Sequence, residues 1–496
     1  MSAPLATEGR DVSPGGRPSS SFSQWMPALI VFGVTGTLVV TILYAPMQNH
    51  VKGGVVCLLM LLLLMLRVPV AVAMGLSGVL GIYAISGELA AVNSMGSLPY
   101  NSTASFTLTV LPLFVFMGIM LWRSGITGQL YDAAKQWVSW LPGGLSSTTI
   151  VAGSGLASVS GSTIGITHAL GRIGIPEMLK AGYDKRIALG SVMVAGTIGQ
   201  LIPPSIYAVV YAGYAETEVG AQLLAGILPG LVLTLAYIGL TITYVTVFPR
   251  LIDRDREARR SAPTWSDRGH ALLEVWPLPA LLLIVIGGIY LGYVTATEAG
   301  AVGAIGATVI AAARMRPAEF GRGLLTALRD TVASTGSIFF LLMGAALLNR
   351  LLSLSGAARW FADFVGDAGL SRFQFIAVVV LIYLLLGMFM EPLSMMLLTV
   401  PILLPVAIAT GIEPIWFGVF FILMAEVAIL TPPVGILTFV THRLAQNPEV
   451  RGDTEITLGD AYQGAAWYIP GVLIVVALIA VFPDIVSVIP DLGSTP

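Results

Sequence analysis

Charged residues are scarce in this sequence. Asp, Glu, Lys and Arg make up 10% of the 496 residues, whereas soluble domains carry about 25%. Hydrophobic residues make up 56% of the chain. This scarcity of charge excludes a large soluble α-helical protein, and nucleic acid is not expected as a partner.

Cysteine and the common catalytic motifs are also missing. The single cysteine, Cys57, lies in an apolar run, so the chain has neither a disulfide framework nor a cysteine-rich metal site. The sequence contains no Walker lysine motif, HExxH, GxSxG or cluster of metal ligands. ATP hydrolysis and hydrolytic chemistry have no visible support, and we expect that the protein is not an enzyme.

Long apolar runs are what the sequence has instead. Stretches of roughly twenty apolar residues recur between positions 26 and 482, and each is long enough to cross about 30 Å of hydrocarbon. Open sheet edges are not tolerated in lipid, and barrel strands would alternate in polarity. The pattern predicts an all-α polytopic membrane protein. Its candidate membrane segments are 26–45, 54–66, 70–86, 106–122, 146–180, 187–214, 222–247, 276–296, 298–313, 331–349, 373–410, 413–440 and 464–484.

The N-terminal segment has a different composition. Residues 1–24 are polar and rich in Ser, Pro and Gly, which predicts a disordered tail. The apolar run from Trp25 to Tyr44 is long for a signal-peptide core, and no small-residue cleavage site stands out after it. We therefore expect a retained helix.

Basic residues lie in particular loops between the apolar runs. Three groups fall within 172–186, 250–260 and 314–329, and two predicted crossings separate each neighbouring pair. All three groups therefore fall on one side, which the positive-inside rule makes cytoplasmic. Counting backward places the N-terminal tail on the same side. The stretch 126–141 has apolar residues at helical spacing, which favours a helix in the cytoplasmic interface or a plain connecting helix.

Prolines and glycines mark an internal repeat. The segment GTIGQLIPPSIYAVV (196–210) interrupts an apolar run with two adjacent prolines, which break helices, and AEVAILTPPVGILTF (425–439) does the same. An offset of 229 positions pairs Pro203 with Pro432, Pro204 with Pro433, Pro176 with Pro405 and Gly182 with Gly411. The coincidences indicate a duplication with units near 140–247 and 370–484.

Each unit also contains an apolar stretch, 146–180 or 373–410, that is too long for one crossing and is interrupted midway. We expect a re-entrant hairpin at each place. If 146–180 returns to the cytoplasmic side, the count makes 373–410 begin and end on the opposite side, so the units have inverted topology. Inverted repeats with broken helices are typical of secondary transporters, whose sites lie near the bilayer midplane. Backbone carbonyl oxygens of an unwound segment, together with Ser and Thr hydroxyls, are suitable ligands for a small cation. The N-termini of half-helices favour an anionic substrate.

These motifs resemble those of a known family. The order SGST, IPEMLKAGY, GTIGQLIPPSI and LAGILPG, then TATEAGAVGA, then MEPL, PILLP and AEVAILTPPVGILTF, is similar to the large membrane subunit of the tripartite ATP-independent periplasmic (TRAP) transporters, over about residues 53–484. The resemblance implies a bacterial inner-membrane protein in an elevator-type, sodium-driven transporter. It also implies two partners, which are a small four-helix membrane subunit and a periplasmic binding protein that delivers a small organic acid or similar solute.

The resemblance implies two sodium sites, each between a hairpin tip and an unwound helix. The first would use Ser160, Gly161, Ser162, Thr163, Gly196, Thr197 and Gly199; the second would use Met390, Glu391, Thr431, Pro432 and Gly435. Substrate is expected beside Ser162, Thr163, Pro203, Pro204 and Pro433. The family often has Ser at Thr163, Asp at Glu391 and Asn at Met424. Glu391 and Glu426 are ionisable groups in apolar runs, for which a functional role is the default hypothesis.

The predicted organisation follows the repeats. The segments are a tail (1–24), an extra helix (25–52), scaffold helices with the interfacial helix (53–140), repeat 1 (141–247), a basic loop with scaffold helices (248–369), repeat 2 (370–484) and a C-terminal tail (485–496). Two other functions remain open, a stand-alone sodium-coupled elevator-type anion transporter and an intramembrane enzyme or channel. The missing catalytic motifs and the duplicated hairpins count against the enzyme or channel.

Overall fold

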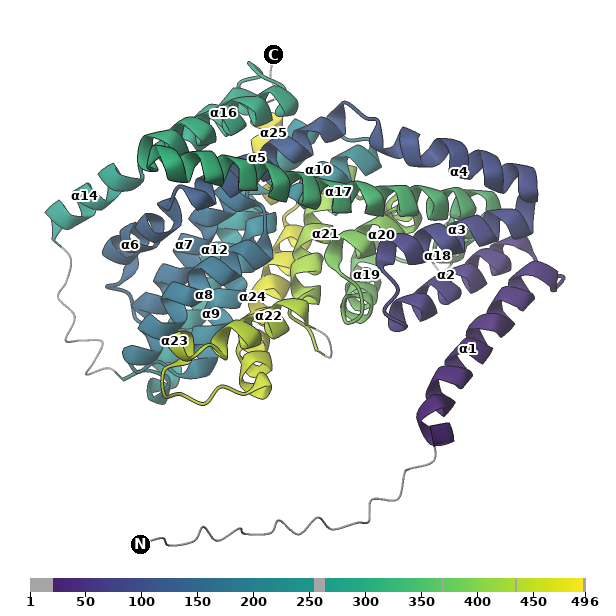
Figure 1. Cartoon of the computed structure of the whole chain (residues 1–496), viewed down its shortest axis with the longest axis horizontal. Helices are drawn as coiled ribbons and strands as arrows, with labels where there is room; N and C mark the ends of the chain where they lie inside the picture. Colours follow the sequence, from purple (N-terminus) through teal and green to yellow (C-terminus); the bar gives the residue numbers. More distant parts are fainter. Residues whose placement is uncertain (1–20, 254–263, 368, 433–434, 494–496) are drawn as a thin grey trace, which may run out of the picture.

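The computed structural model describes residues 21–253, 264–367, 369–432 and 435–493 (Figure 1). Within these ranges the chain forms helices and no β-strand, apart from one isolated antiparallel bridge between Tyr183 and Ile252. The predicted all-α architecture is confirmed. The first twenty residues of the predicted tail and Pro433 of the second proline pair lie outside the described residues.

The N-terminal helices follow the apolar runs closely. They are α1 (Ser21–Tyr44), α2 (Asn49–Met65), α3 (Val70–Ser86), α4 (Glu88–Thr103), η1 (Thr107–Thr109), α5 (Val110–Arg123) and α6 (Ile126–Val138). The run 53–87 forms two helices, because Arg67 takes a left-handed backbone conformation (φ 63°) and Pro69 opens α3. Helix α4, which is more polar than its neighbours, was not among the predicted segments.

Each predicted repeat unit contains a helical hairpin followed by a broken helix. Unit 1 comprises α7 (Gly144–Ser160), α8 (Thr163–Lys180), α9 (Lys185–Thr197), η2 (Ile198–Gln200), α10 (Ile206–Ala215), α11 (Val219–Ala225) and α12 (Ile227–Val247). Unit 2 comprises α19 (Arg372–Gly387), α20 (Pro392–Ala409), α21 (Pro414–Ala428), α22 (Ile436–Ala445), α23 (Pro448–Arg451) and α24 (Leu458–Val481). The first break contains Pro203 and Pro204, and the second contains Pro432, as predicted.

The two broken helices run in opposite directions. Lys185, at the start of α9, donates a hydrogen bond of 2.9 Å to the backbone oxygen of Glu455, in the loop between α23 and α24; the next residue, Ile456, accepts one of 2.9 Å from Gln446 at the end of α22. Tyr211, in the second half of α10, donates one of 2.6 Å to the backbone oxygen of Pro414, at the start of α21. The beginning of each broken helix thus lies beside the end of the other, an arrangement compatible with inverted repeats.

The segment between the units differs most from the prediction. It contains η3 (Pro249–Leu251), α14 (Trp265–Val275), α15 (Pro277–Tyr290), α16 (Ala296–Arg314), α17 (Pro317–Ser355) and α18 (Ala357–Asp367). Arg322 and Arg329 were expected in a basic loop but lie on α17, because α16 and α17 are joined by a tight turn at Met315 and Arg316. A further helix, α25 (Asp484–Gly493), covers most of the expected C-terminal tail.

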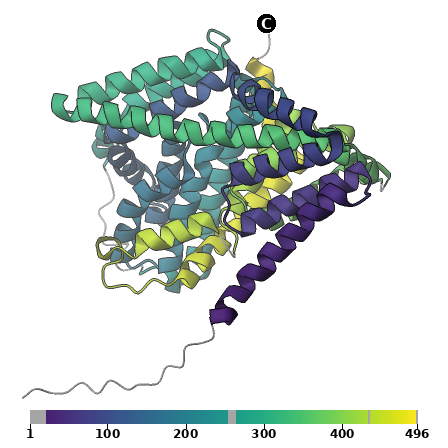
Figure 2. The same ribbon diagram turned by 45° about the vertical axis from the view of Figure 1, so that its right-hand side comes forward.

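Helix α17 is too long for an upright crossing. Its 39 residues span about 58 Å at 1.5 Å per residue, roughly twice the hydrocarbon thickness. It runs across the other helices in both views and packs on α2, α3, α4, α5 and α20 (Figures 1 and 2). Helices α7, α8, α9, α12, α22 and α24 pack with one another beside this frame. The long helix therefore braces the N-terminal helices against the hairpin-bearing part of the chain.

Helix length and hydropathy alone identify fewer membrane spans than the sequence pattern did. Among the described residues, five helices are long and apolar enough to cross a membrane, or up to seven if each bent pair counts as one span. The shortfall has a physical reason, since the halves of the broken helices, α9, α10, α21 and α22, are individually too short to cross, whereas the hairpin arm α20 is long enough. The structure is that of a multi-pass membrane protein.

Opposite orientation of the two units predicts opposite accessibility of their hairpin ends. In a Cys57→Ala background, Lys180→Cys and Glu413→Cys place a thiol at exposed positions just before α9 and just before α21. We expect an impermeant maleimide to label Lys180→Cys only from the cytoplasmic side and Glu413→Cys only from the other side of oriented vesicles. Labelling of both from one side would contradict the inverted arrangement.

Candidate functional site

The first hairpin turns at Gly161 and Ser162. Gly161 has φ +54°, a left-handed conformation that glycine adopts without strain and that ends α7. The Ser162 hydroxyl accepts a hydrogen bond of 3.2 Å from the amide of Gly165 and so caps α8. Ser162 therefore has a structural task at the tip, whatever else it binds. The side chain of Ser160 lies outside the described residues.

This tip packs directly on the break between α9 and α10. The Gln200 amide donates a hydrogen bond of 2.6 Å to the backbone oxygen of Gly161. A Cβ atom on Gly161 would lie 2.9 Å from the backbone oxygen of Pro204, so a larger residue would push the tip away from the proline pair. Gln200 was not predicted as a site residue, although it lies between Gly199 and the prolines.

Two glycines of α9 and η2 allow α8 and α7 to approach closely. A Cβ on Gly196 would lie 2.1 Å from the Thr167 hydroxyl oxygen and 2.9 Å from the backbone oxygen of Thr163. A Cβ on Gly199 would lie 2.5 Å from Ile166 and 4.0 Å from the Cα of Ala157. The structure thus brings Gly196 and Gly199 to the hairpin, but the expected unwinding at Gly196, Thr197 and Gly199 is wrong, because these residues lie in α9 and η2 and the non-helical stretch begins at Leu201.

The first break is non-helical from Leu201 to Ser205. Pro203 and Pro204 are buried there and supply no amide donor. The Ser205 hydroxyl donates to the backbone oxygen of Gln200 and accepts a bond of 3.1 Å from the amide of Ala208, which caps α10. The break is therefore a defined turn that ends one half-helix and starts another.

The second hairpin repeats this arrangement with other residues. Met390 is buried at its tip, and the Glu391 carboxylate accepts a hydrogen bond of 2.9 Å from the Ser394 hydroxyl. A Cβ on Gly387 would lie 2.0 Å from the Cβ of Ala428, where α21 ends. The offset of 229 positions pairs Ala428 with Gly199, so matched positions carry the close contact between hairpin and broken helix in both units.

The second break turns at Gly435, with φ +47°. A Cβ there would lie 3.2 Å and 3.3 Å from the backbone oxygens of Leu430 and Thr431. The Thr431 hydroxyl donates a hydrogen bond of 2.7 Å to the backbone oxygen of Val427, and Pro432 follows Thr431 in the turn. The Thr431 hydroxyl therefore serves its own helix, while the backbone oxygens face the turn.

Glu426 joins the two units. Its side chain is fully buried on α21, and neither carboxylate oxygen has a hydrogen-bond partner among the described residues. The neighbouring polar group that acts on this carboxylate is the Thr163 side chain at the tip of the first hairpin. Tyr207 lies within electrostatic reach of both Glu426 and Glu391. Elements of both units thus meet around one carboxylate that the predicted sodium sites did not include.

Several oxygens around this contact lack donors. Among the described residues, the side-chain oxygens without a hydrogen-bond partner include those of Thr163, Thr167, Glu426 and the amide oxygen of Gln200. Buried polar atoms are normally paired, so an unpaired set of oxygens that includes a buried carboxyl group favours binding of a cation. Thr197 does not belong to this set. Its hydroxyl donates a hydrogen bond of 2.9 Å to the backbone oxygen of Val194 and lies 3.3 Å from the Tyr237 hydroxyl.

Comparison with known proteins identifies the family. The family model for the "Tripartite ATP-independent periplasmic transporter, DctM component" matches residues 55–485. The C4-dicarboxylate TRAP transporter large permease protein DctM of Pseudomonas aeruginosa is 32% identical over 422 residues, which are 84% of this chain and 94% of the relative. The sialic acid TRAP transporter large permease protein SiaM of Vibrio cholerae is 30% identical over 389 residues, 78% of this chain and 87% of the relative. The chain belongs to the DctM component family of TRAP transporters, and it is a transport protein, not an enzyme.

A solved structure supports the fold. The YdaH transporter of Alcanivorax borkumensis aligns with a TM-score of 0.55 and 16% sequence identity, covering 88% of this chain and 98% of that one. At this identity the likeness concerns the fold alone.

The close approach at Gly196 predicts a large effect of a single methyl group. Gly196→Ala drives a Cβ into the Thr167 hydroxyl, and such overpacking costs about 1–3 kcal/mol. We expect a lower midpoint of thermal unfolding in detergent, with partial recovery in the double variant with Thr167→Ala. Gly239→Ala on α12 is the matched control, since no atom lies within 4 Å of its Cβ. Equal stability of Gly196→Ala and Gly239→Ala would contradict the described packing.

Proposed function

We propose that the protein is the large permease subunit of a sodium-coupled TRAP transporter that imports a small organic acid or similar solute. The observation that carries the sodium proposal is the cluster of donor-free oxygens around Glu426, at the meeting point of the first hairpin tip and α21. Sodium is a hard cation that suits carboxylate, hydroxyl and carbonyl oxygens. A bound cation would balance the charge of the ionised Glu426 carboxylate, whose oxygens have no hydrogen-bond partner among the described residues.

The helix termini at the hairpin tips and breaks favour binding of an anionic solute close to the proposed sodium site. Helices α8, α10, α20 and α22 begin at the two tips and two breaks. Their N-termini carry partial positive charge and unpaired amides, which favour a carboxylate. Helices α7, α9, α19 and α21 end at the same tips and breaks, and their C-termini favour a cation. Both relatives named above carry a carboxylic acid in their names.

We assign the predicted residues accordingly. The first sodium ion would be held by Thr163, Gly196 and Glu426, with Gly161 and Ser162 shaping the tip. The second would lie between Met390–Glu391 and the turn at 431–435. The solute would lie between the two tips, beside Pro203 and Pro204. Ser160 and Pro433 stay predictions from the resemblance alone.

The partners and the motion belong to the same proposal. The family assignment supports a periplasmic binding protein that delivers the solute and a small membrane subunit that completes the complex. The helices that carry the hairpins pack as a group beside the frame braced by α17. This division favours an elevator-type movement of the hairpin group relative to the frame. The membrane would be the bacterial inner membrane, with the N-terminus on the cytoplasmic side.

Uptake should need both sodium and the binding protein. The complete complex in proteoliposomes, given a C4-dicarboxylate or sialic acid with the cognate binding protein, should take up solute only with an inward sodium gradient. Replacing sodium with potassium should reduce the rate to background. Undiminished uptake with potassium in place of sodium would contradict the proposed sodium coupling. Uptake without the binding protein would favour a stand-alone transporter.

Glu426 should set the affinity for sodium. Glu426→Gln keeps the shape of the side chain but removes the charge, and charge–oxygen interactions in buried sites are worth several kcal/mol when lost. We expect the sodium concentration for half-maximal uptake to rise about tenfold or more, since about 1.4 kcal/mol corresponds to one factor of ten.

The matched control for this measurement is Glu413→Gln, at the exposed start of the same helix. It should leave the sodium dependence unchanged. A Glu426→Gln protein with wild-type sodium dependence would show that the carboxylate has only a packing role.

A further inference from the structure

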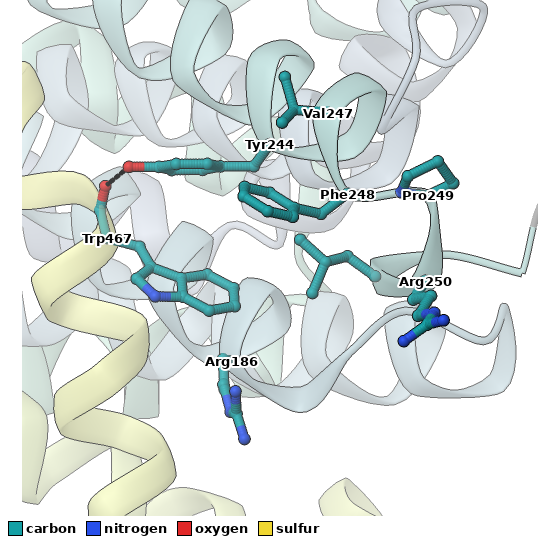
Figure 3. A pocket seen from close by; sticks show the side chains of 8 residues that line it. Arg186, Tyr244, Val247, Phe248, Pro249, Arg250 and Trp467 are labelled. Atoms are coloured by element: carbon teal, nitrogen blue, oxygen red, sulfur yellow. Dashed lines mark hydrogen bonds between the residues drawn. The ribbon is translucent and has the colours of Figure 1, made fainter.

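A second feature lies at the end of α12, away from both hairpin tips. Here the chain forms a cavity of about 490 Å³ lined by residues of α9, α12, η3 and α24, a volume within the range of about 300–1,000 Å³ typical of small-molecule sites. The lining side chains that matter are Arg186, Tyr244, Phe248, Arg250, Leu251 and Trp467 (Figure 3). None of them belongs to the candidate transport site.

The aromatic wall of this cavity is held in place by direct contacts. The Tyr244 hydroxyl donates a hydrogen bond of 2.6 Å to the backbone oxygen of Trp467, which ties α12 to α24. The two rings lie 5.8 Å apart between centroids. Phe248 adds a third ring at the mouth and is 56% exposed, next to Val247 at 60%. The wall is therefore apolar, fixed and open to the surroundings.

Two guanidinium groups lie below these rings in the view of Figure 3. Arg186 lies 5.8 Å from the Trp467 ring centroid, and its Nε atom is buried without a hydrogen-bond partner among the described residues. Its carboxylate neighbours are distant, at 4.0 Å for Asp184 and 3.9 Å for Asp460. Asp460 is already held by Lys185 at 2.8 Å, so the Arg186 charge has hydrogen-bonding capacity to spare.

Arg250 supplies the second positive charge. It is exposed at the turn η3, and it forms no ion pair with a carboxylate of the described residues. Lys185, Arg186 and Arg250 lie near three carboxylates, Asp184, Asp253 and Asp460, so the mouth has spare guanidinium donors and no net charge. A phosphodiester would use these donors, because guanidinium groups bind phosphate oxygens through charge-assisted hydrogen bonds.

The position of the cavity favours a lipid headgroup as the source of such a phosphodiester. The apolar span Val219–Val247 ends at its edge, so the cavity lies where α12 leaves the membrane. The chain then enters the basic segment 250–260, on the side predicted to be cytoplasmic. Aromatic rings and arginines at this level are typical of the lipid headgroup region. The exposed apolar wall suits an acyl chain and would be costly to leave facing water.

We propose that this cavity binds an anionic phospholipid of the cytoplasmic leaflet. Its phosphate lies between Arg186 and Arg250, and the upper part of an acyl chain packs on Tyr244, Phe248 and Trp467. The lipid joins α9 and α12 of unit 1 to α24 of unit 2, so it stabilises the hairpin-bearing group from its cytoplasmic end.

The test is lipid retention by the purified full-length protein. Native mass spectrometry after detergent exchange should detect retained phosphatidylglycerol, and Arg250→Gln should reduce the retained amount about fivefold, as expected for loss of one arginine near an anionic headgroup. Phe248→Ser should reduce it as well. Arg322→Gln, an exposed arginine on α17, is the control and should retain lipid like the wild type.

A thermal-shift series on the delipidated protein separates the possible ligands. Dioleoyl phosphatidylglycerol should raise the unfolding midpoint of the wild type and of Arg322→Gln, and should raise that of Arg250→Gln much less. Dioleoyl phosphatidylcholine and glycerol phosphate should have little effect. Equal protection by glycerol phosphate would mean a soluble anion, equal protection by phosphatidylcholine would mean a non-selective apolar surface, and either result would overturn the proposal. Equal phosphatidylglycerol retention by wild type and Arg250→Gln would overturn it too.

Discussion

A carboxyl group enclosed by apolar helices needs a compensating cation, a set of donors or a bound proton, and neither oxygen of Glu426 has a hydrogen-bond partner within bonding distance among the described residues. This requirement organises the site. The carboxylate sits on α21 of the second unit, and the Thr163 side chain at the tip of the first unit acts on it. Any cation bound here would hold the two units together, and its loss would leave an uncompensated charge that favours their separation or rearrangement.

The two units reach this point through prolines placed at matched positions and through glycines at the close contacts. The proline pairs end one half-helix and begin another, so backbone groups and helix termini are available where a continuous helix would have used them. Glycines and alanines then let each hairpin pack against its broken helix, as Gly196 does beside Thr167 and Gly387 beside Ala428. The site therefore depends on close backbone packing as much as on the polar side chains.

The hairpins and breaks were predictable because their signals are local: prolines and glycines at a fixed offset, within runs too long for one crossing. The long helix α17 was not, because only packing against α2–α5 distinguishes a 39-residue brace from a loop followed by a crossing. Gly161 and Thr163 lie at the hairpin tip and Gly196 lies against it, whereas their roles in binding sodium stay predictions. The influence of the Thr163 side chain on Glu426, the Gln200 hydrogen bond to Gly161 and the bond between Thr197 and Tyr237 depend on tertiary structure, which no spacing rule contains.

The central claim is that sodium occupies the oxygen cluster around Glu426. Equilibrium binding of radioactive sodium to the purified protein, with potassium as competitor, tests it without requiring transport, solute or partners. The account predicts saturable sodium binding that potassium does not displace, with at least one site lost in Glu426→Gln and retained in Glu413→Gln. Identical binding by wild type and Glu426→Gln would contradict it.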